Sequence, residues 1–349
     1  MNESFKLSKE VISFIHNQNK KHNFCKYNIY ELETSQITTI HSKIYIFKKS
    51  TVNLFVVKIP FEENKADIEY KNYILFNKNN NSDLIKLLKP YQNNYEFNIH
   101  LSSFFIIFHK YHNIHLLIMS YIAYKTVGDL VKNDNSVLHN FGMAIASINI
   151  QHFSIKNELP TKDIKYFNSH IKRSLETINF FNNNLIKKKS FSIDLNKVHL
   201  KWNEHLKNLK ISQKFHFGCC HGDVNLFNFF YKNEKSQFYI TPIDMSRFSL
   251  QAPICSEYFS AIYNIYKLGV QLKYTDSKIL SLVDCFSEGY KNYIDINKLN
   301  EYEIRFYRYS WLVMTIIYYM NFLNVNNRDL IEHLLNKALY NDNIDLHFI

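Results

Sequence analysis

The sequence predicts an α+β fold with a small, β-rich N-terminal part and a larger, mostly helical C-terminal part. Runs rich in β-branched and aromatic residues, such as 53–59, recur between residues 27 and 119. Beyond residue 120, apolar residues return mainly at helical spacing. A chain of 349 residues is long enough for two domains of this kind. We therefore expect domains at 1–119 and 120–349.

The N-terminal part divides into one helix and several strands. Residues 1–26 are predicted to form a polar amphipathic helix whose apolar positions include Val11 and Ile15. Strands are predicted at 43–47, 53–59, 104–108 and 114–119, with turns between them. The first hairpin turn is predicted at 33–39, which is rich in Ser and Thr.

The C-terminal part reads as a series of helices. One begins near residue 135, two lie within 160–215, and others fill the chain from residue 256 onward. The stretch 309–325 carries no charge, but it is marginally short for a membrane span and contains several polar residues. We expect it to be a buried helix of the larger domain.

The overall charge is strongly positive. The formal net charge is +11, and charged residues make up 21% of the chain. Such a balance suits acidic glycans, nucleic acids or an anionic membrane surface, and it disfavours a polycationic ligand. Scattered lysines on a solvated surface are the simpler explanation, and we expect no nucleic acid partner.

The cysteines and the N-terminus indicate a compartment. Five cysteines occur, and their odd number and spacing fit reduced thiols rather than disulfides or a metal site. Residues 1–6 contain no apolar signal core. We therefore expect a cytoplasmic protein without a transmembrane segment, although contact with a membrane surface is compatible with the charge.

One ordered set of polar residues carries most of the functional information. Asp223 precedes Asn228 by five residues, and Asp244 follows at the end of a second apolar run. Phosphoryl transfer needs a carboxylate at the attacking hydroxyl and oxygen ligands for Mg²⁺. A lone His-Gly-Asp tripeptide is often only a turn, but the acid, the amide and the second acid in this order are far more specific.

The stretch His221-Gly222-Asp223, followed by Asn228 and Asp244, resembles the aminoglycoside phosphotransferase and choline kinase-like family of the protein-kinase-like superfamily. The resemblance implies a two-lobed protein-kinase-like fold, with a small β-rich N-lobe and a larger, mostly helical C-lobe. It also implies that Asp223 is the catalytic base and that Asn228 and Asp244 bind Mg²⁺. His221 would brace this loop through hydrogen bonds.

The resemblance assigns further residues of the small lobe to the nucleotide. Lys58, at the end of a predicted strand, would contact the α- and β-phosphates of ATP. Glu69, one turn into the next helical pattern, would hold Lys58 by an ion pair. Glu62 and Glu63 are alternatives for that partner.

The phosphate loop and the hinge complete the expected nucleotide site. No glycine precedes Gly128, so the family's Gly-rich loop is absent. In the predicted turn at 33–39, a hydroxyl such as that of Ser35 would contact phosphate instead. Ser120, Tyr121 and Ile122 resemble the hinge whose backbone binds the adenine edge in the family.

The helix after Asp244 also matches the family. Pro253 and Glu257 stand where the family often carries a proline and an acid that open the next buried helix. Glu257 would tie this helix to the catalytic loop. The alternative is simply a favourable charge in a first helical turn.

The resemblance implies an ATP- and Mg²⁺-dependent phosphotransferase that acts on a hydroxyl of a small molecule, with a sugar or glycan as the expected acceptor. Residues 162–214 are rich in lysine, which favours a neutral or anionic acceptor. Their few acids are Asp163, Glu176, Asp194 and Glu204. The identity of the acceptor and the choice between ATP and GTP stay open.

Three other functions are compatible with parts of the sequence. One is a kinase of lipopolysaccharide or capsular sugars, which the positive charge favours. A second is a protein kinase, but no Ala-Pro-Glu signature follows Asp244. A third is a non-catalytic nucleotide-binding pseudokinase, against which the joint presence of Asp223, Asn228, Asp244 and Lys58 counts.

Overall fold

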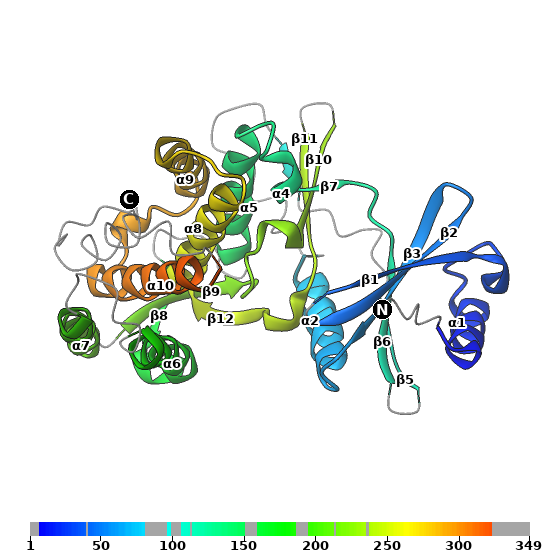
Figure 1. Cartoon of the computed structure of the whole chain (residues 1–349), viewed down its shortest axis with the longest axis horizontal. Helices are drawn as coiled ribbons and strands as arrows, with labels where there is room; N and C mark the ends of the chain where they lie inside the picture. The colour runs from blue at the N-terminus through cyan, green and yellow to red at the C-terminus, as the bar shows by residue number, and fades with distance from the viewer. Residues whose placement is uncertain are drawn as a thin grey trace. The chain divides into compact units, whose positions relative to one another are not determined.

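The computed structural model describes residues 7–39, 41–80, 96–98, 106–111, 114–150, 159–185, 195–212, 214–234 and 237–322. The chain forms two compact units (Figure 1). The first comprises Met1–Asn81, His100–Tyr124 and Asp244–Ser246, and the second comprises Ser82–Ile99, Lys125–Ile243 and Arg247–Ile349. The expected domains at 1–119 and 120–349 stay a prediction, because Ser82–Ile99 belongs to the second unit and Asp244–Ser246 to the first.

The first unit is built on an antiparallel sheet of five strands. Their order across the sheet is β1 (Glu33–Thr38), β2 (Ser42–Lys49), β3 (Val52–Pro60), β6 (Ile114–Ser120) and β5 (Ile106–Tyr111). The strands predicted at 43–47, 53–59 and 114–119 are confirmed. The strand predicted at 104–108 is confirmed from residue 106, and its first two residues lie outside the described residues.

The hairpin turn predicted at 33–39 is wrong, because most of that segment is strand β1. Ser35 lies in the middle of β1, opposite Ile46 of β2, and therefore cannot be a turn residue. The turn lies between Thr39 and Ser42. The Thr39 hydroxyl accepts from the backbone N–H of Ser42 and donates to its carbonyl, each at 3.0 Å. A side-chain hydroxyl thus closes a turn that has no glycine.

Helices cover the two faces of this sheet. On one face, α1 (Lys9–His22) buries Val11 and Ile15 in a core that includes Phe55 and Val57 of β3. Because successive side chains of a strand point to opposite faces, Lys58 points away from α1. It meets α2 (Lys65–Asn80), which packs against β3, β5 and β6.

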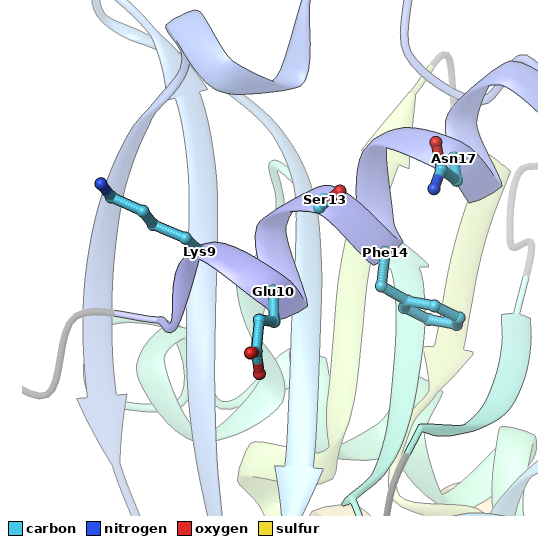
Figure 2. A pocket seen from close by; sticks show the side chains of 5 residues that line it. All are labelled: Lys9, Glu10, Ser13, Phe14 and Asn17. Atoms are coloured by element: carbon cyan, nitrogen blue, oxygen red, sulfur yellow. The ribbon is translucent and has the colours of Figure 1, made fainter.

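The helix predicted at 1–26 is confirmed over Lys9–His22. The Ser8 hydroxyl accepts from the backbone N–H of Val11 and caps its first turn. A shallow pocket of about 340 Å³ lies along α1, lined by Lys9, Glu10, Ser13, Phe14 and Asn17 (Figure 2). It is on the α1 side of the sheet and is therefore separate from Lys58.

The second unit contains most of the helices. In chain order they are α4 (Val127–Leu130), α5 (Ser136–Ile150), α6 (Asn168–Leu185), α7 (Leu195–Ser212), α8 (Ile254–Gln271), α9 (Asp276–Lys291) and α10 (Glu301–Phe322). The helices predicted near 135, within 160–215 and after 256 are confirmed. Tyr309, Leu312 and Val313 of α10 are buried. No helix in the described part of the chain is long and apolar enough to cross a membrane.

Two small sheets of this unit carry the motif residues. In the first, β9 (Lys214–Cys220) lies between β12 (Ser249–Pro253) and β8 (Thr161–Asp163), and His221 follows β9 directly. The second has the order β4 (Glu96–Asn98), β11 (Gln237–Pro242), β10 (Phe229–Glu234) and β7 (Lys125–Thr126). The β10–β11 hairpin begins just after Asn228 and ends two residues before Asp244, which accounts for the spacing of the motif.

Helices α5 and α9 approach each other through two glycines. A Cβ atom on Gly142 would lie 2.1 Å from the carbonyl oxygen of Phe286, and one on Gly289 would lie 1.9 Å from that of His139. Neither position has room for a side chain, so the two helix backbones are in direct contact (Figure 1).

We predict that Gly142→Ala lowers the free energy of unfolding by about 1 to 3 kcal/mol, because the added methyl group forces α5 and α9 apart. The sign of this change in unfolding free energy distinguishes close packing from helix propensity, because Gly→Ala inside a helix otherwise stabilises a protein by about 0.5–1 kcal/mol. Urea unfolding measures the change, with Ser281→Ala on the exposed side of α9 as the control. A Gly142→Ala variant as stable as the wild type would contradict the close packing.

Candidate functional site

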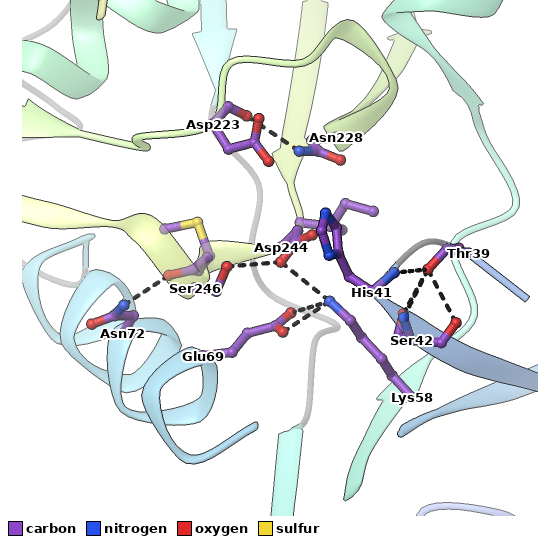
Figure 3. Close-up of polar contacts among 12 residues, drawn as sticks. Thr39, His41, Ser42, Lys58, Glu69, Asn72, Asp223, Asn228, Asp244 and Ser246 are labelled. Carbon is purple, nitrogen blue, oxygen red and sulfur yellow. Dashed lines mark hydrogen bonds and ion pairs between the residues drawn. The ribbon is translucent and has the colours of Figure 1, made fainter. Parts of the chain in front are cut away.

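In the first unit, the buried ammonium of Lys58 lies between two carboxylates (Figure 3). Its Nζ donates to Oε1 and Oε2 of Glu69 at 3.0 and 2.8 Å, and it lies 3.2 Å from Oδ1 of Asp244. The predicted pair of Lys58 and Glu69 is therefore confirmed. Among the described residues, Glu62 and Glu63, the alternative partners, make no ion pair with Lys58.

The electrostatics keep this group charged. Burial alone would lower the pKa of Lys58, but Glu69 and Asp244 together raise it above its ordinary value. Burial works in the other direction on Asp244, yet the ammoniums of Lys58 and Lys65 hold the pKa of Asp244 below its ordinary value. Lys58 and Asp244 are therefore both ionised at neutral pH.

Asp244 is held in an unusual backbone conformation. Its φ angle of 57° lies in the left-handed region, which is uncommon for a residue other than glycine. The Ser246 hydroxyl donates to Oδ1 of Asp244 at 3.1 Å, and Nδ2 of Asn72 donates to the carbonyl oxygen of Met245 at 2.8 Å. Helix α2 thus holds the Asp244 segment directly through Asn72, one turn after Glu69.

In the second unit, the loop after β9 is fixed by its own backbone and by His221. The carbonyl oxygen of Ile243 lies 2.8 Å from Nε2 of His221, and the backbone N–H of Asp223 donates to Nδ1 of His221 at 3.3 Å. Asn228 Nδ2 donates to the carbonyl oxygen of Asp223 at 3.2 Å. The predicted bracing role of His221 therefore has a direct geometric basis.

Glu257 holds the same loop from α8. Its carboxylate accepts from the backbone N–H groups of His221 and Gly222, at 2.7 and 3.0 Å. Burial raises the pKa of Glu257 to about 7, and the two N–H groups oppose that rise. Gly222 has a φ of 79°, so the loop turns there in a conformation that favours glycine.

Asp244 in the first unit and Asn228 in the second each carry an oxygen that suits a hard cation. Both contacts of the Asp244 carboxylate fall on Oδ1, and the hydrogen bond of Asn228 uses its amide nitrogen. Within the described part of the chain, Oδ2 of Asp244 and Oδ1 of Asn228 thus remain as acceptors. No group of three or more His, Cys, Asp or Glu side chains in the described residues could hold a metal ion. A Mg²⁺ ion bound by either residue would therefore need phosphate oxygens or water as further ligands.

Two residues of the expected hinge, Ser120 and Tyr121, are paired with the neighbouring strand β3. Ser120 ends β6 opposite Phe55, and the backbone N–H of Tyr121 donates to the carbonyl oxygen of Leu54 at 3.3 Å. Ile122 follows the strand without regular structure. The N–H of Tyr121 is consequently occupied, and a role of the hinge in adenine binding stays a prediction.

Two contributors to the site were missed at the sequence level. Asn72 lies 173 residues from its partner, Met245, so no local pattern relates them. Thr39 was grouped with a turn that proved to be a strand, although its hydroxyl closes the real turn. A Thr followed three residues later by a Ser at the start of an apolar alternation was the available signal for this turn.

We predict that Glu257 makes the stability of the protein fall as the pH rises from about 5 to 8. Its pKa of about 7 lies above the ordinary value of 4.5, so the stabilisation by the protonated form is lost as the pH passes through 7. The fall in unfolding free energy between pH 5 and pH 8 should be smaller in Glu257→Gln than in the wild type, by an amount of order 3 kcal/mol. Unfolding free energies across the pH range provide the measurement.

The matched control is Glu288→Gln, which changes an exposed carboxyl on α9. It should follow the wild-type profile. Equal pH slopes for the wild type and Glu257→Gln would show that burial does not raise the pKa of Glu257.

Comparisons with known proteins identify the fold. No family model matches the sequence, and no curated protein matches it. Among solved structures, the ethanolamine kinase of Plasmodium vivax matches with a TM-score of 0.52 and 12% identity, over 95% of this chain and 89% of that one. Aminoglycoside phosphotransferases match with TM-scores from 0.42 to 0.49.

Two further kinases match equally well. A glucosamine kinase gives a TM-score of 0.52 at 11% identity, over 88% of this chain and 78% of that one. A microcompartment-associated aminopropanol kinase gives 0.52 at 10% identity, over 96% and 100%. At such low identity the likeness concerns the fold alone. This chain therefore has a two-lobed α+β kinase-like fold, as its sequence predicted.

Proposed function

We propose that this protein is an ATP- and Mg²⁺-dependent phosphotransferase that transfers the γ-phosphoryl group to a hydroxyl of a small molecule, a sugar or glycan. The observation that carries the proposal is the buried Lys58, held at 2.8–3.0 Å by Glu69 and at 3.2 Å by Asp244. A lysine on the third strand paired with a glutamate of the next helix is the arrangement that positions ATP phosphates in kinases.

Each motif residue has a role in the proposed reaction. Asp223 orients the acceptor hydroxyl and takes its proton as the hydroxyl oxygen bonds to the γ-phosphorus. The bond from that phosphorus to the β–γ bridging oxygen breaks, and ADP leaves. Lys58 binds the α- and β-phosphates, while His221 and Glu257 keep the loop of Asp223 rigid by the hydrogen bonds described above.

Asp244 and Asn228 would hold Mg²⁺, which neutralises charge on the transferred phosphoryl group. The proposal is supported by their uncommitted oxygens, Oδ2 and Oδ1, and by the lowered pKa of Asp244, which keeps a carboxylate ready for a cation. Backbone groups near Ile122 are proposed for adenine. Ser35 lies within a strand and is not a turn residue. We therefore propose the turn closed by Thr39, in place of Ser35, as the contact to the ATP phosphates.

The acceptor is proposed from charge and from the comparisons. A glucosamine kinase shares the fold, and ethanolamine and aminopropanol kinases also act on hydroxyl-bearing small molecules. The formal net charge of +11 disfavours a polycationic acceptor such as an aminoglycoside. A kinase of lipopolysaccharide or capsular sugars is one form of this proposal. A pseudokinase is disfavoured because the polar groups that chemistry needs are all present.

Asp223→Asn is predicted to lower turnover at saturating substrates by about 10² to 10⁴-fold, since the amide cannot accept the hydroxyl proton. Binding of MgATP and the thermal midpoint should stay near their wild-type values, because the exchange preserves shape. The assay measures ATP consumption with sugars, glycan fragments, choline and aminoglycosides as acceptors. Turnover within tenfold of the wild type would remove Asp223 from the role of base.

Asn72→Ala is predicted to raise the Mg²⁺ concentration needed for half-maximal ATP binding about fivefold, which corresponds to one lost hydrogen bond of about 1 kcal/mol. Without the bond to Met245, α2 no longer helps to hold Asp244 at its positive φ. Calorimetric titration with ATP at several Mg²⁺ concentrations gives the value.

Lys71→Ala is the control, because Lys71 is the neighbouring residue of α2, is itself exposed, and pairs with Asp67 alone among the described residues. It should leave the Mg²⁺ dependence unchanged. If Asn72→Ala behaves like Lys71→Ala, the bond to Met245 does not position Asp244 for a metal.

A further inference from the structure

A cationic side chain without an acidic partner among the described residues lies beside the strand that leads to Asp223. Lys162 of β8 donates to the side-chain amide oxygen of Gln251 in β12, so its half-buried side chain crosses over β9. Its ammonium lies 4.9 Å from the ring centroid of Phe217 and 5.7 Å from that of Tyr166. We call Lys162, Gln251 and Tyr166 the basic cluster.

The charge of Lys162 is not neutralised within the described part of the chain. Nearby acids are already paired with other cations, Asp163 with Lys165 at 3.3 Å and Glu176 with Lys172 at 3.8 Å. Lys162 instead has a neutral amide and two aromatic rings. These partners favour a cation but do not cancel its field.

The surroundings add to the positive potential. Arg173, on α6, also has no carboxylate within ion-pair distance among the described residues. Burial, and then the charge of Arg173, lower the pKa of His170 on the same helix. This side of the second unit therefore attracts an anion.

The cluster lies beside β9, the strand that leads to Asp223. Gln251 lies between Ser249, which is opposite Cys220 of β9, and Ala252, which is opposite Gly218. The four residues from Cys219 to Asp223 span at most about 14 Å of chain. A glycan that spans this distance places a second group at Lys162 while its reacting hydroxyl is at Asp223.

Tyr166 gives the cluster a second feature. Its side chain is 65% exposed, in contrast to Phe217, which is buried beneath Lys162. An exposed ring beside a cation offers a flat apolar face for the carbon-bound hydrogens of a sugar and a charge for its substituent.

We propose that the acceptor is an acidic sugar whose carboxylate or phosphate group binds the ammonium of Lys162. This inference rests on the proposed phosphotransferase function and names the substrate class of that site. The oxyanion takes hydrogen bonds from Lys162, which keeps Gln251 as its anchor, and the sugar ring lies against Tyr166. Charge-assisted hydrogen bonds of this kind are stronger than neutral ones.

The test is direct binding of three probes to the nucleotide-free, full-length protein by calorimetry: glucose, glucuronate and glucose 6-phosphate. We expect the wild type to bind at least one anionic probe about tenfold more tightly than glucose. Comparison of the two anions tells a carboxylate site from a phosphate site. Lys162→Met should remove the preference, and Lys162→Arg should keep most of it.

Lys172→Met is the matched control, because it removes a nearby exposed lysine that is paired with Glu176. It should preserve the preference for the anion. The proposal is overturned if the three probes bind the wild type equally, or if Lys162→Met and Lys172→Met lose the same affinity. Because binding is measured without ATP, such a result leaves the phosphotransferase proposal standing, which the Asp223→Asn assay tests separately.

Discussion

The buried ammonium of Lys58 imposes the strongest constraint on the first unit. A charge removed from water is tolerated only when opposite charges and hydrogen bonds replace the lost solvation. Lys58 therefore requires Glu69 and Asp244 at hydrogen-bond distance, and this requirement fixes α2 against the sheet and a remote three-residue segment against α2. The ion pair with Lys58 also offsets the cost of the left-handed backbone conformation of Asp244, which local preferences alone would disfavour.

In the second unit, one buried carboxylate, that of Glu257, satisfies backbone groups that would otherwise be unpaired. The loop after β9 is irregular, so its backbone N–H groups have no strand partner and would be left unpaired in a buried place. Glu257 accepts two of them, and His221 bonds to the backbone of Ile243. Holding a buried carboxylate for this purpose raises its pKa to about 7, so rigidity of the loop is obtained at a cost in stability above that pH.

Much of the fold and several site residues could be predicted because their signals are local. A strand reveals itself by alternation and a helix by its 3.6-residue period, so most elements were found from the sequence. The pairing of Lys58 with Glu69 followed from a strand end and the next helical turn. The segment at Ser35 was misassigned because an exposed edge strand rich in Ser and Thr lacks an apolar alternation and resembles a turn.

The sequence by itself determined the order and chemical type of the polar residues, including the five-residue spacing from Asp223 to Asn228. These residues could be recognised because the loop and the hairpin that follows it are close together in the sequence. Only the tertiary structure decided which distant groups meet them. Asn72 reaches the segment of Asp244 across 173 residues, and Lys162 meets Gln251 across 89. Such contacts depend on how helices and strands pack, and packing leaves no periodic trace around either partner.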